Sequence, residues 1–277
     1  MTEPDKKSVE LVTPYGRLTV LARGAALISW KHVINGNPTE LLCQSGSIKK
    51  EDNPDYVGAI VGPRAGRYDF GEGVVLHSGD SGTSNCNFTL KTINNSIVAS
   101  LEHESGFYTV TYSLSEDGLN ISIEVRPEGK LILNPTSHLY FSIDGKTADE
   151  HILKTGSRVM CKKTGELATG LTEVPEELDF YLHRFIMDSK IDDCFLFADP
   201  EFYIEASGIR LKLITDSTSA VIYTYDFPED KSDLRSGIAI EPQAPPNAQA
   251  YDEDGYLWKL SDDVYSSNIK WKIELVN

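Results

Sequence analysis

Alternation of apolar and polar residues over short stretches is the feature that most constrains how this chain can fold. Seven stretches show it, and each joins β-branched or aromatic side chains with polar ones: Leu18–Leu21, Phe107–Tyr112, Leu119–Val125, Phe202–Glu205, Ile209–Leu213, Ala220–Tyr225 and Lys270–Leu275. A period of two is that of a β-strand with one buried face. Short turns follow several of the stretches, such as Glu116-Asp117-Gly118 and Ser207-Gly208. Turns this short indicate hairpins, and therefore antiparallel pairing.

Helical patterns are almost absent, the best being short ones at Ala148–Leu153 and Pro175–Leu178. Parallel strands need long crossover connections, usually helices, so a parallel sheet is not expected. The chain of 277 residues shows no internal repeat, low-complexity tract or linker. We therefore predict an all-β fold, a large antiparallel β-sandwich with few short helices, as a single domain spanning residues 1–277.

Composition narrows the class of partner. The formal net charge is −16, from 42 acidic and 26 basic side chains, whereas nucleic acids and anionic membranes attract basic surfaces. The acidity most simply keeps the protein soluble, and it is compatible with a small neutral ligand. Met1–Glu10 lacks the apolar core of a signal peptide, and no apolar run approaches the roughly 20 residues of a membrane span. We expect a cytoplasmic protein with no nucleic-acid or membrane partner.

The cysteines and the irregular segments carry weaker signals. Four cysteines lie far apart in the sequence without a CxxC pair, which predicts reduced thiols and neither a zinc site nor a redox motif: Cys43, Cys86, Cys161 and Cys194. Three segments rich in Gly, Ser, Asn and Asp do not fit the strand pattern: Cys43–Val57, Leu76–Asn87 and Asp226–Gly237. Long irregular segments often carry binding groups, but we expect the first and third to serve mainly as connections.

Two histidines have unusual surroundings. On an expected strand, Thr136, His138 and Tyr140 share one face, which indicates a lined cavity, although a single histidine in such a setting is more often structural. His77 stands where a strand runs into a glycine-bearing loop, a place that suits binding and simple exposure equally. His103 lies between two glutamates, but neighbouring strand residues point to opposite faces, so no metal site is expected there.

Glu241 ends an apolar run that begins at Gly237, and prolines at 242, 245 and 246 fix the exit of the chain. A carboxylate that closes a buried strand should have a raised pKa, which suits a general base. A strand-terminal glutamate facing water fits the pattern equally well. Arg64, Arg67 and Asp192 are further polar candidates, since a guanidinium can hold two sugar hydroxyls. Taken singly, each is more often an ion-pair or turn residue.

In their order along the chain, these pieces resemble the aldose 1-epimerase (galactose mutarotase) family. Asn134–Phe141 resembles its Asn-x-Thr-x-His-x-Tyr-Phe segment, which implies that His138 is the acid that protonates the ring oxygen. Glu241–Asn247 resembles its Glu-x-Gln…Pro-Asp segment, which implies that Glu241 is the base. The resemblance covers nearly the whole chain and implies the galactose mutarotase-like β-sandwich.

The same resemblance implies three sugar-binding residues. Leu76–Gly79 is similar to Leu-His-Gly-Gly, Ala65–Arg67 to Ala-Asn-Arg, and Ile191–Phe195 to the segment whose first Asp holds hydroxyls. His77, Arg67 and Asp192 would then bind the substrate. Four positions depart from the pattern and leave the preferred sugar open: Gly66, Ser78, Ser142 and Val221.

The implied activity is interconversion of the α and β anomers of a free hexose such as galactose or glucose, without metal or cofactor. An alternative is a hexose-6-phosphate 1-epimerase, which needs a cationic phosphate pocket; only Arg64 and Arg67 offer one. A non-catalytic carbohydrate-binding protein would not need both an acid and a base. A glycoside hydrolase usually uses paired carboxylates. Whether the protein is a monomer or a homodimer stays open.

Overall fold

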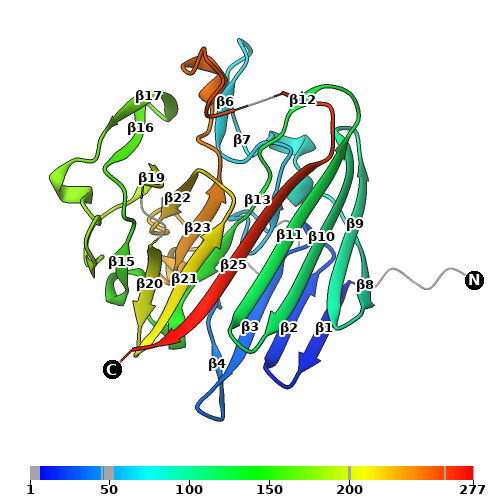
Figure 1. Ribbon diagram of the computed structural model, residues 1–277, viewed down its shortest axis with the longest axis vertical. Helices are drawn as coiled ribbons and strands as arrows, with labels where there is room; N and C mark the ends of the chain where they lie inside the picture. Colours follow the sequence, from blue (N-terminus) through cyan, green and yellow to red (C-terminus); the bar gives the residue numbers. More distant parts are fainter. Residues whose placement is uncertain (1–6, 45, 47–52, 199–200, 259, 277) are drawn as a thin grey trace, which may run out of the picture.

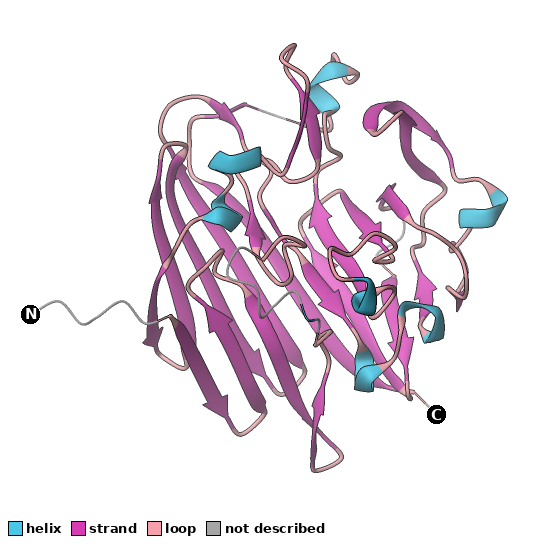
Figure 2. Cartoon of the chain, turned by 180° about the vertical axis from the view of Figure 1, so that it is seen from behind, coloured by secondary structure: helices cyan, strands magenta, loops and turns pink. Residues whose placement is uncertain are grey.

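The computed structural model describes residues 7–44, 46, 53–198, 201–258 and 260–276. Figures 1 and 2 show that the regular secondary structure of this part of the chain is almost entirely β-strand. Every pairing between its strands is antiparallel, while one isolated bridge, between Arg64 and Asn134, is parallel. The predicted antiparallel all-β fold is confirmed.

The largest sheet has nine strands in the order β18-β15-β20-β21-β25-β11-β10-β9-β8. Their bounds are β8 (Thr89–Ile93), β9 (Ser96–His103), β10 (Gly106–Ser115), β11 (Gly118–Pro127), β15 (Ile152–Lys154), β18 (Arg184–Phe185), β20 (Phe202–Ala206), β21 (Ile209–Thr215) and β25 (Tyr265–Leu275). Five of the seven stretches with a period of two fall within these strands. Buried and partly exposed residues alternate along β10, with Tyr108, Val110 and Tyr112 fully buried. The alternation therefore marks one face of this sheet as the core face.

The second large sheet has six strands in the order β14-β23-β22-β19-β16-β17. Their bounds are β14 (Leu139–Phe141), β16 (Val159–Thr164), β17 (Leu167–Glu173), β19 (Asp192–Leu196), β22 (Ser219–Tyr223) and β23 (Ile238–Gln243). Phe141 of β14 packs on Trp271 of β25, with ring centroids 4.4 Å apart. Both rings belong to one continuous buried cluster. The two sheets therefore enclose a common core, as expected for a sandwich.

Smaller sheets complete the molecule. Four consecutive strands form a meander: β1 (Ser8–Thr13), β2 (Gly16–Leu21), β3 (Leu27–Ile34) and β4 (Asn37–Glu40). Three further sheets have two strands each: β5 (Ile60–Val61) with β13 (Thr136–Ser137), β6 (Arg67–Asp69) with β7 (Val74–Leu76), and β12 (Leu131–Ile132) with β24 (Leu260–Ser261). The pair β6–β7 carries Arg67 and Leu76, which line the candidate site, and β13 ends immediately before His138.

The helices of the described residues are single 3-10 turns of three residues: η2 (Gly79–Ser81), η3 (Thr83–Asn85), η4 (Ile143–Gly145), η5 (Ala148–Glu150), η6 (Glu176–Leu178), η7 (Lys231–Asp233) and η8 (Ala248–Ala250). The expected turn at Pro175–Leu178 is confirmed by η6. The expected helix over Ala148–Leu153 is wrong beyond Glu150, because the chain enters β15 at Ile152 and pairs there with β18 and β20. The described residues include no helix with the length and apolarity to span a membrane.

Candidate active site

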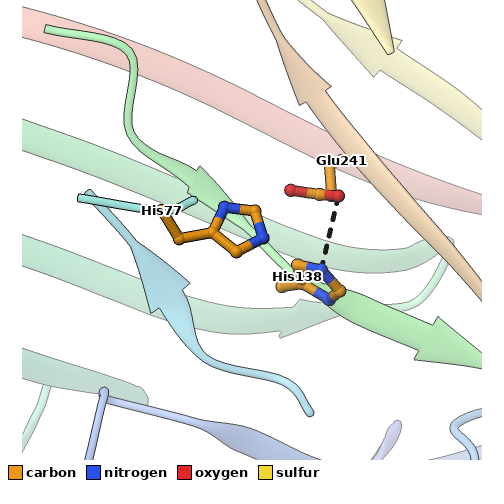
Figure 3. Close-up of side chains that lie close together, drawn as sticks. All are labelled: His77, His138 and Glu241. Atoms are coloured by element: carbon orange, nitrogen blue, oxygen red, sulfur yellow. Dashed lines mark ion pairs between the residues drawn. The ribbon is translucent and has the colours of Figure 1, made fainter. Parts of the chain in front are cut away.

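Three buried side chains from distant parts of the sequence meet at one cavity, as Figure 3 shows. They are His77, which follows β7, His138, which lies between β13 and β14, and Glu241 of β23. Each residue is at most 5% exposed. The cavity has a volume of about 250 Å³. The fold thus brings together the predicted acid, the predicted base and one predicted sugar contact.

Glu241 lies inside a strand rather than at its end. The sequence predicted that the apolar run stops at this carboxylate, but β23 continues through Pro242 to Gln243. Proline has no N–H, yet Pro242 sits opposite Ala220 of β22 without interrupting the ladder. Val221 of β22 is opposite Glu241. The carboxylate therefore projects from the middle of a sheet, and the strand-terminal, solvent-facing alternative is wrong.

His138 occupies a break between two short strands. The expected continuous strand is wrong here, because β13 ends at Ser137 and β14 begins at Leu139. The backbone of His138 is nevertheless fixed on both sides, since its N–H donates to the Ala59 carbonyl at 2.9 Å and its carbonyl accepts from the Gly58 N–H at 2.9 Å. The neighbouring Tyr140 ring packs 5.1 Å from the imidazole, centroid to centroid. These contacts hold the ring in place.

The imidazole and the carboxylate touch. His138 Nε2 lies 3.3 Å from Glu241 Oε1, within reach of a shared proton. Burial raises the pKa of Glu241 to about 8, a shift that the nearby Asp192 reinforces and Arg67 opposes. Burial lowers the pKa of His138 to about 4. At neutral pH the pair therefore holds one proton, and in the free site it resides on the carboxyl group.

Two polar atoms of this pair are left over. Among the described residues, neither His138 Nδ1 nor Glu241 Oε2 has a hydrogen-bond partner, although both atoms are buried. A buried polar atom without a partner costs about 1–3 kcal/mol. The arrangement is thus poor for stability, which is typical of groups kept for a ligand or for chemistry.

His77 is oriented by the backbone of Gly66. The Gly66 N–H donates to His77 Nδ1 at 3.0 Å, and the His77 N–H donates to the Gly66 carbonyl at 2.9 Å. Burial holds the pKa of His77 well below its usual value, so the ring is neutral. With Nδ1 as acceptor, Nε2 carries the proton. His77 therefore offers a hydrogen-bond donor to the cavity.

The same tautomer bears on metal binding. Ligand atoms of His77, His138 and Glu241 lie within 4.8 Å of one another, a grouping that resembles a metal site. A metal needs a lone pair on the ligating nitrogen. His77 Nε2 carries a proton and Nδ1 is occupied by the Gly66 N–H. The three residues therefore do not fit a resident metal ion while the Gly66 bond is in place.

The two predicted hydroxyl contacts pair across the cavity wall. Arg67 of β6 donates through Nη1 to Asp192 Oδ2 of β19 at 3.4 Å, and its Nε lies 3.5 Å from Glu166. Lys163 of β16 contacts Asp193 at 3.0 Å and donates to the Asp192 carbonyl. Burial raises the pKa of Asp192. Arg67 and Asp192 both line the cavity and offer a donor and an acceptor side by side.

Arg64 does not line the cavity that Arg67 lines. Its guanidinium packs over the Phe70 ring at 4.8 Å and lines a separate cavity. Of the four departures from the family pattern, Gly66 and Val221 line the site, whereas Ser78 and Ser142 make local bonds. The Ser78 hydroxyl bonds the backbone of Arg64, and the Ser142 hydroxyl donates to the Lys146 carbonyl. Gly66 and Val221 are therefore the departures placed to affect sugar recognition.

The sequence analysis did not identify several residues that line the cavity. Asp55 and Tyr56 from the first irregular segment and Phe227 from the third line the cavity, so neither segment is merely a connection; residues 45 and 47–52 of the first lie outside the described residues. The Tyr56 ring packs edge-on against His77, with centroids 4.7 Å apart. Tyr223 also lines the cavity and accepts from the Phe227 N–H at 2.7 Å. Isolated aromatic residues in loops give no periodic signal that could have identified them.

Comparisons with known proteins agree with this architecture. The family model described as aldose 1-epimerase matches residues 7–270. A GalM/aldose epimerase homologue from C. elegans superposes with a TM-score of 0.85 at 21% identity, covering 98% of this chain and 99% of that one. A galactose 1-epimerase from Lactobacillus acidophilus superposes with a TM-score of 0.81 at 19% identity, covering 98% of this chain and 95% of that one. A galactose mutarotase-like protein from Clostridium acetobutylicum superposes with a TM-score of 0.71 at 15% identity, covering 97% of this chain and 95% of that one. No curated protein matches the sequence.

Proposed function

Because the chain belongs to the aldose 1-epimerase family, we propose that it interconverts the α and β anomers of a free hexose such as galactose or glucose. The observation that carries the proposal is the buried contact between His138 Nε2 and Glu241 Oε1, which lie 3.3 Å apart. Anomer interconversion needs a base at the C1 hydroxyl and an acid at the ring oxygen. When a single proton moves from Glu241 to His138, this pair provides both the base and the acid.

The proposed reaction begins when the shared proton moves from Glu241 to His138. The pair is then a carboxylate and an imidazolium, which are the base and acid required. Glu241 takes the proton of the C1 hydroxyl while His138 protonates the ring oxygen, and the bond between C1 and the ring oxygen breaks. Rotation about C1–C2 exposes the other face of the aldehyde. Reclosure with the roles reversed gives the other anomer and restores the pair.

The remaining predicted residues position the sugar. His77 donates from Nε2 and supports the negative charge that develops on the ring oxygen. Arg67 and Asp192, already paired at 3.4 Å, hold hydroxyl groups on the far side of the ring. No step of this mechanism requires a metal ion or an organic cofactor.

A free sugar is favoured over a phosphorylated one. Among the described residues, the cations Arg67 and Lys163 lie near the cavity and are paired with the carboxylates of Glu166, Asp192 and Asp193. Arg64, the other residue considered for a phosphate pocket, faces a different cavity. A purely sugar-binding protein is also disfavoured, because binding alone gives no reason to keep a buried carboxyl group with an unpartnered oxygen.

Polarimetry of freshly dissolved α-D-glucose and α-D-galactose tests the proposal. We expect the wild-type protein to accelerate the change in rotation, and Glu241→Gln and His138→Asn each to lose about 10²–10⁴-fold. Glu205→Gln is the matched control, since Glu205 is a partly buried carboxylate paired with Arg210 at 2.9 Å on the nine-stranded sheet. Nearly intact mutarotation in Glu241→Gln would refute the assignment of the base.

A further inference from the structure

Two cysteines that are distant in the sequence face each other beside the site. Cys161 is in β16 and Cys194 in β19, which pair antiparallel with Val159 opposite Leu196 and Met160 opposite Phe195. The same register continued by one position sets Cys161 opposite Cys194. Both thiols are free and buried, and they belong to the same small buried cluster.

The backbone already has the dimensions of a disulfide. Residues directly opposite in an antiparallel pair have Cα atoms about 4.5 or 5.5 Å apart, and disulfides join Cα atoms about 4.4–6.8 Å apart. Side chains of such a pair project from the same face of the sheet. A bond between the two sulfur atoms would therefore require little movement of β16 or β19.

The two thiols have different environments. Cys161 Sγ lies 3.6 Å from the Tyr251 hydroxyl, and hydrogen bonds from Cys194 and then Tyr251 lower the pKa of Cys161. Burial raises the pKa of Cys194 well above its usual value. A thiol that ionises more readily beside one that stays protonated is the arrangement of an attacking and a resolving cysteine.

We propose that Cys161 and Cys194 form a redox site that closes reversibly into a disulfide on reaction with a peroxide. The Cys161 thiolate attacks one peroxide oxygen, the O–O bond breaks, and Cys161 becomes a sulfenic acid. The leaving hydroxide takes up the proton that the Cys161 thiol had released and departs as the first water. The Cys194 sulfur then attacks the Cys161 sulfur, the S–O bond breaks, and a second water leaves. Two thiols lose two electrons in total, and one hydrogen peroxide is reduced to two waters.

The disulfide would lie beside the cavity, on the same face of the six-stranded sheet. Cys194 is opposite Val221, which is opposite Glu241, so the three residues form a row across β19, β22 and β23. Val221 lines the cavity and packs against the two cysteines. Asp192 lies two residues before Cys194 on the same face of β19. Oxidation therefore acts on Val221 and Asp192 rather than on the acid–base pair, and we expect it to change KM about 2- to 10-fold while kcat stays within about 2-fold; this consequence rests on the proposed function.

Mass spectrometry of the folded full-length protein tests the redox site independently of any activity. After treatment with hydrogen peroxide we expect a loss of two hydrogens, a peptide linked through Cys161 and Cys194, and reversal by dithiothreitol. Cys161→Ser and Cys194→Ser should lose the link, whereas Cys86→Ser, which changes a partly exposed cysteine elsewhere, should keep it. Wild-type protein in which both cysteines stay reduced, or in which either forms a sulfonic acid without a link, would overturn the proposal.

The kinetic consequence has its own measurement. KM and kcat for the sugar are compared in reduced and oxidised Cys86→Ser. A changed KM with a retained kcat supports the link to the cavity wall, and unchanged constants despite a mapped disulfide would overturn that link. If no sugar were turned over by reduced protein, the proposed function would fail while the mapped disulfide still stood.

Discussion

At the scale of single residues, the site depends on where one proton resides. Glu241 and His138 are both buried, and burial disfavours the charged form of each. The free pair is therefore neutral overall, whereas the proposed reaction uses its charged form. The 3.3 Å contact lets one proton transfer create both charges together, so in the proposed reaction neither charge is buried without its partner. This explains how an acid and a base can coexist in a closed cavity.

The pH dependence of activity follows from the same proton. The active pair carries one proton. Below pH about 4, His138 is protonated while Glu241 keeps its own proton, so no base remains. Above pH about 8, Glu241 ionises while His138 stays neutral, so no acid remains. We expect kcat/KM for mutarotation, corrected for the uncatalysed rate, to form a plateau that falls on both sides. A fall beginning near pH 6.5 would instead assign the acid limb to an unperturbed histidine.

Replacing Glu241 should lower activity but raise stability at alkaline pH. The folded-state pKa of Glu241 is raised to about 8 from its ordinary value of 4.5, so folding is progressively disfavoured as pH rises from about 4.5 to 8. Glu241→Gln removes this ionisation. We expect the variant and the wild-type protein to have nearly equal free energies of unfolding at pH 5. At pH 8 the free energy of unfolding of the variant should be higher by on the order of 4 kcal/mol, with a correspondingly higher unfolding temperature.

Thermal unfolding followed by circular dichroism at both pH values measures the difference. Glu205→Gln serves as the control, because its carboxylate is paired with Arg210 and no such gain is expected. A Glu241→Gln protein no more stable than wild type at pH 8 would mean that Glu241 is not held protonated by burial.

At the scale of elements, Gly66 links β6 to the site. Its φ is +87°, and a Cβ there would meet Pro246 Cβ at 2.7 Å. Gly66→Ala should therefore push the Gly66 N–H away from His77 Nδ1 and release the His77 ring. We expect kcat/KM for mutarotation to fall about 10- to 100-fold.

Gly36→Ala is the matched control for Gly66→Ala. Gly36 has a similar φ of +80°, but a Cβ there meets nothing within 4 Å, and it lies in the turn between β3 and β4. Both variants carry the strain of a left-handed backbone, so a loss of activity in Gly66→Ala alone isolates the clash with Pro246. Equal effects would show that strain, rather than the position of His77, is responsible.

The elements also show how far sequence reasoning reaches. Period-two stretches such as Phe107–Tyr112 lie within strands, because alternation reports a single buried face directly. It cannot report β13, β14 and β23, where both faces are buried and the residues around His138 and Glu241 show no alternation. His138 and Glu241 were candidates from their local surroundings, but their proposed roles as acid and base came from a resemblance in the order of short motifs. Tyr56 and the pairing of Cys161 with Cys194 depend on tertiary neighbours that no local pattern records.

At the scale of the whole molecule, the nine-stranded and six-stranded sheets have different roles. The nine-stranded sheet buries alternating residues and supplies the core. The six-stranded sheet carries Glu241 and Asp192, His138 immediately precedes its strand β14, and His77 follows β7. Figure 2 shows many of the loops gathered on one side of these sheets. Strands and the residues next to them therefore hold Glu241 and His138, while loops supply Tyr56 and Phe227 to the cavity wall.

The net charge of −16 acts on ligands before they reach the cavity. A hexose 6-phosphate is dianionic near neutral pH and is repelled, whereas a free hexose is not. With Arg67 and Lys163 already paired with carboxylates, no compensating attraction is expected at the site. We expect kcat/KM for glucose 6-phosphate to be at least about 10-fold below that for glucose at an ionic strength of about 0.01 M. The difference in kcat/KM between the two sugars should become smaller at an ionic strength of about 0.3 M, because the Debye length falls from about 30 Å to below 10 Å. The kcat/KM for glucose should stay constant. Polarimetry of both sugars over this range makes the comparison, and faster turnover of the phosphate at low salt would reverse the assignment of the substrate class.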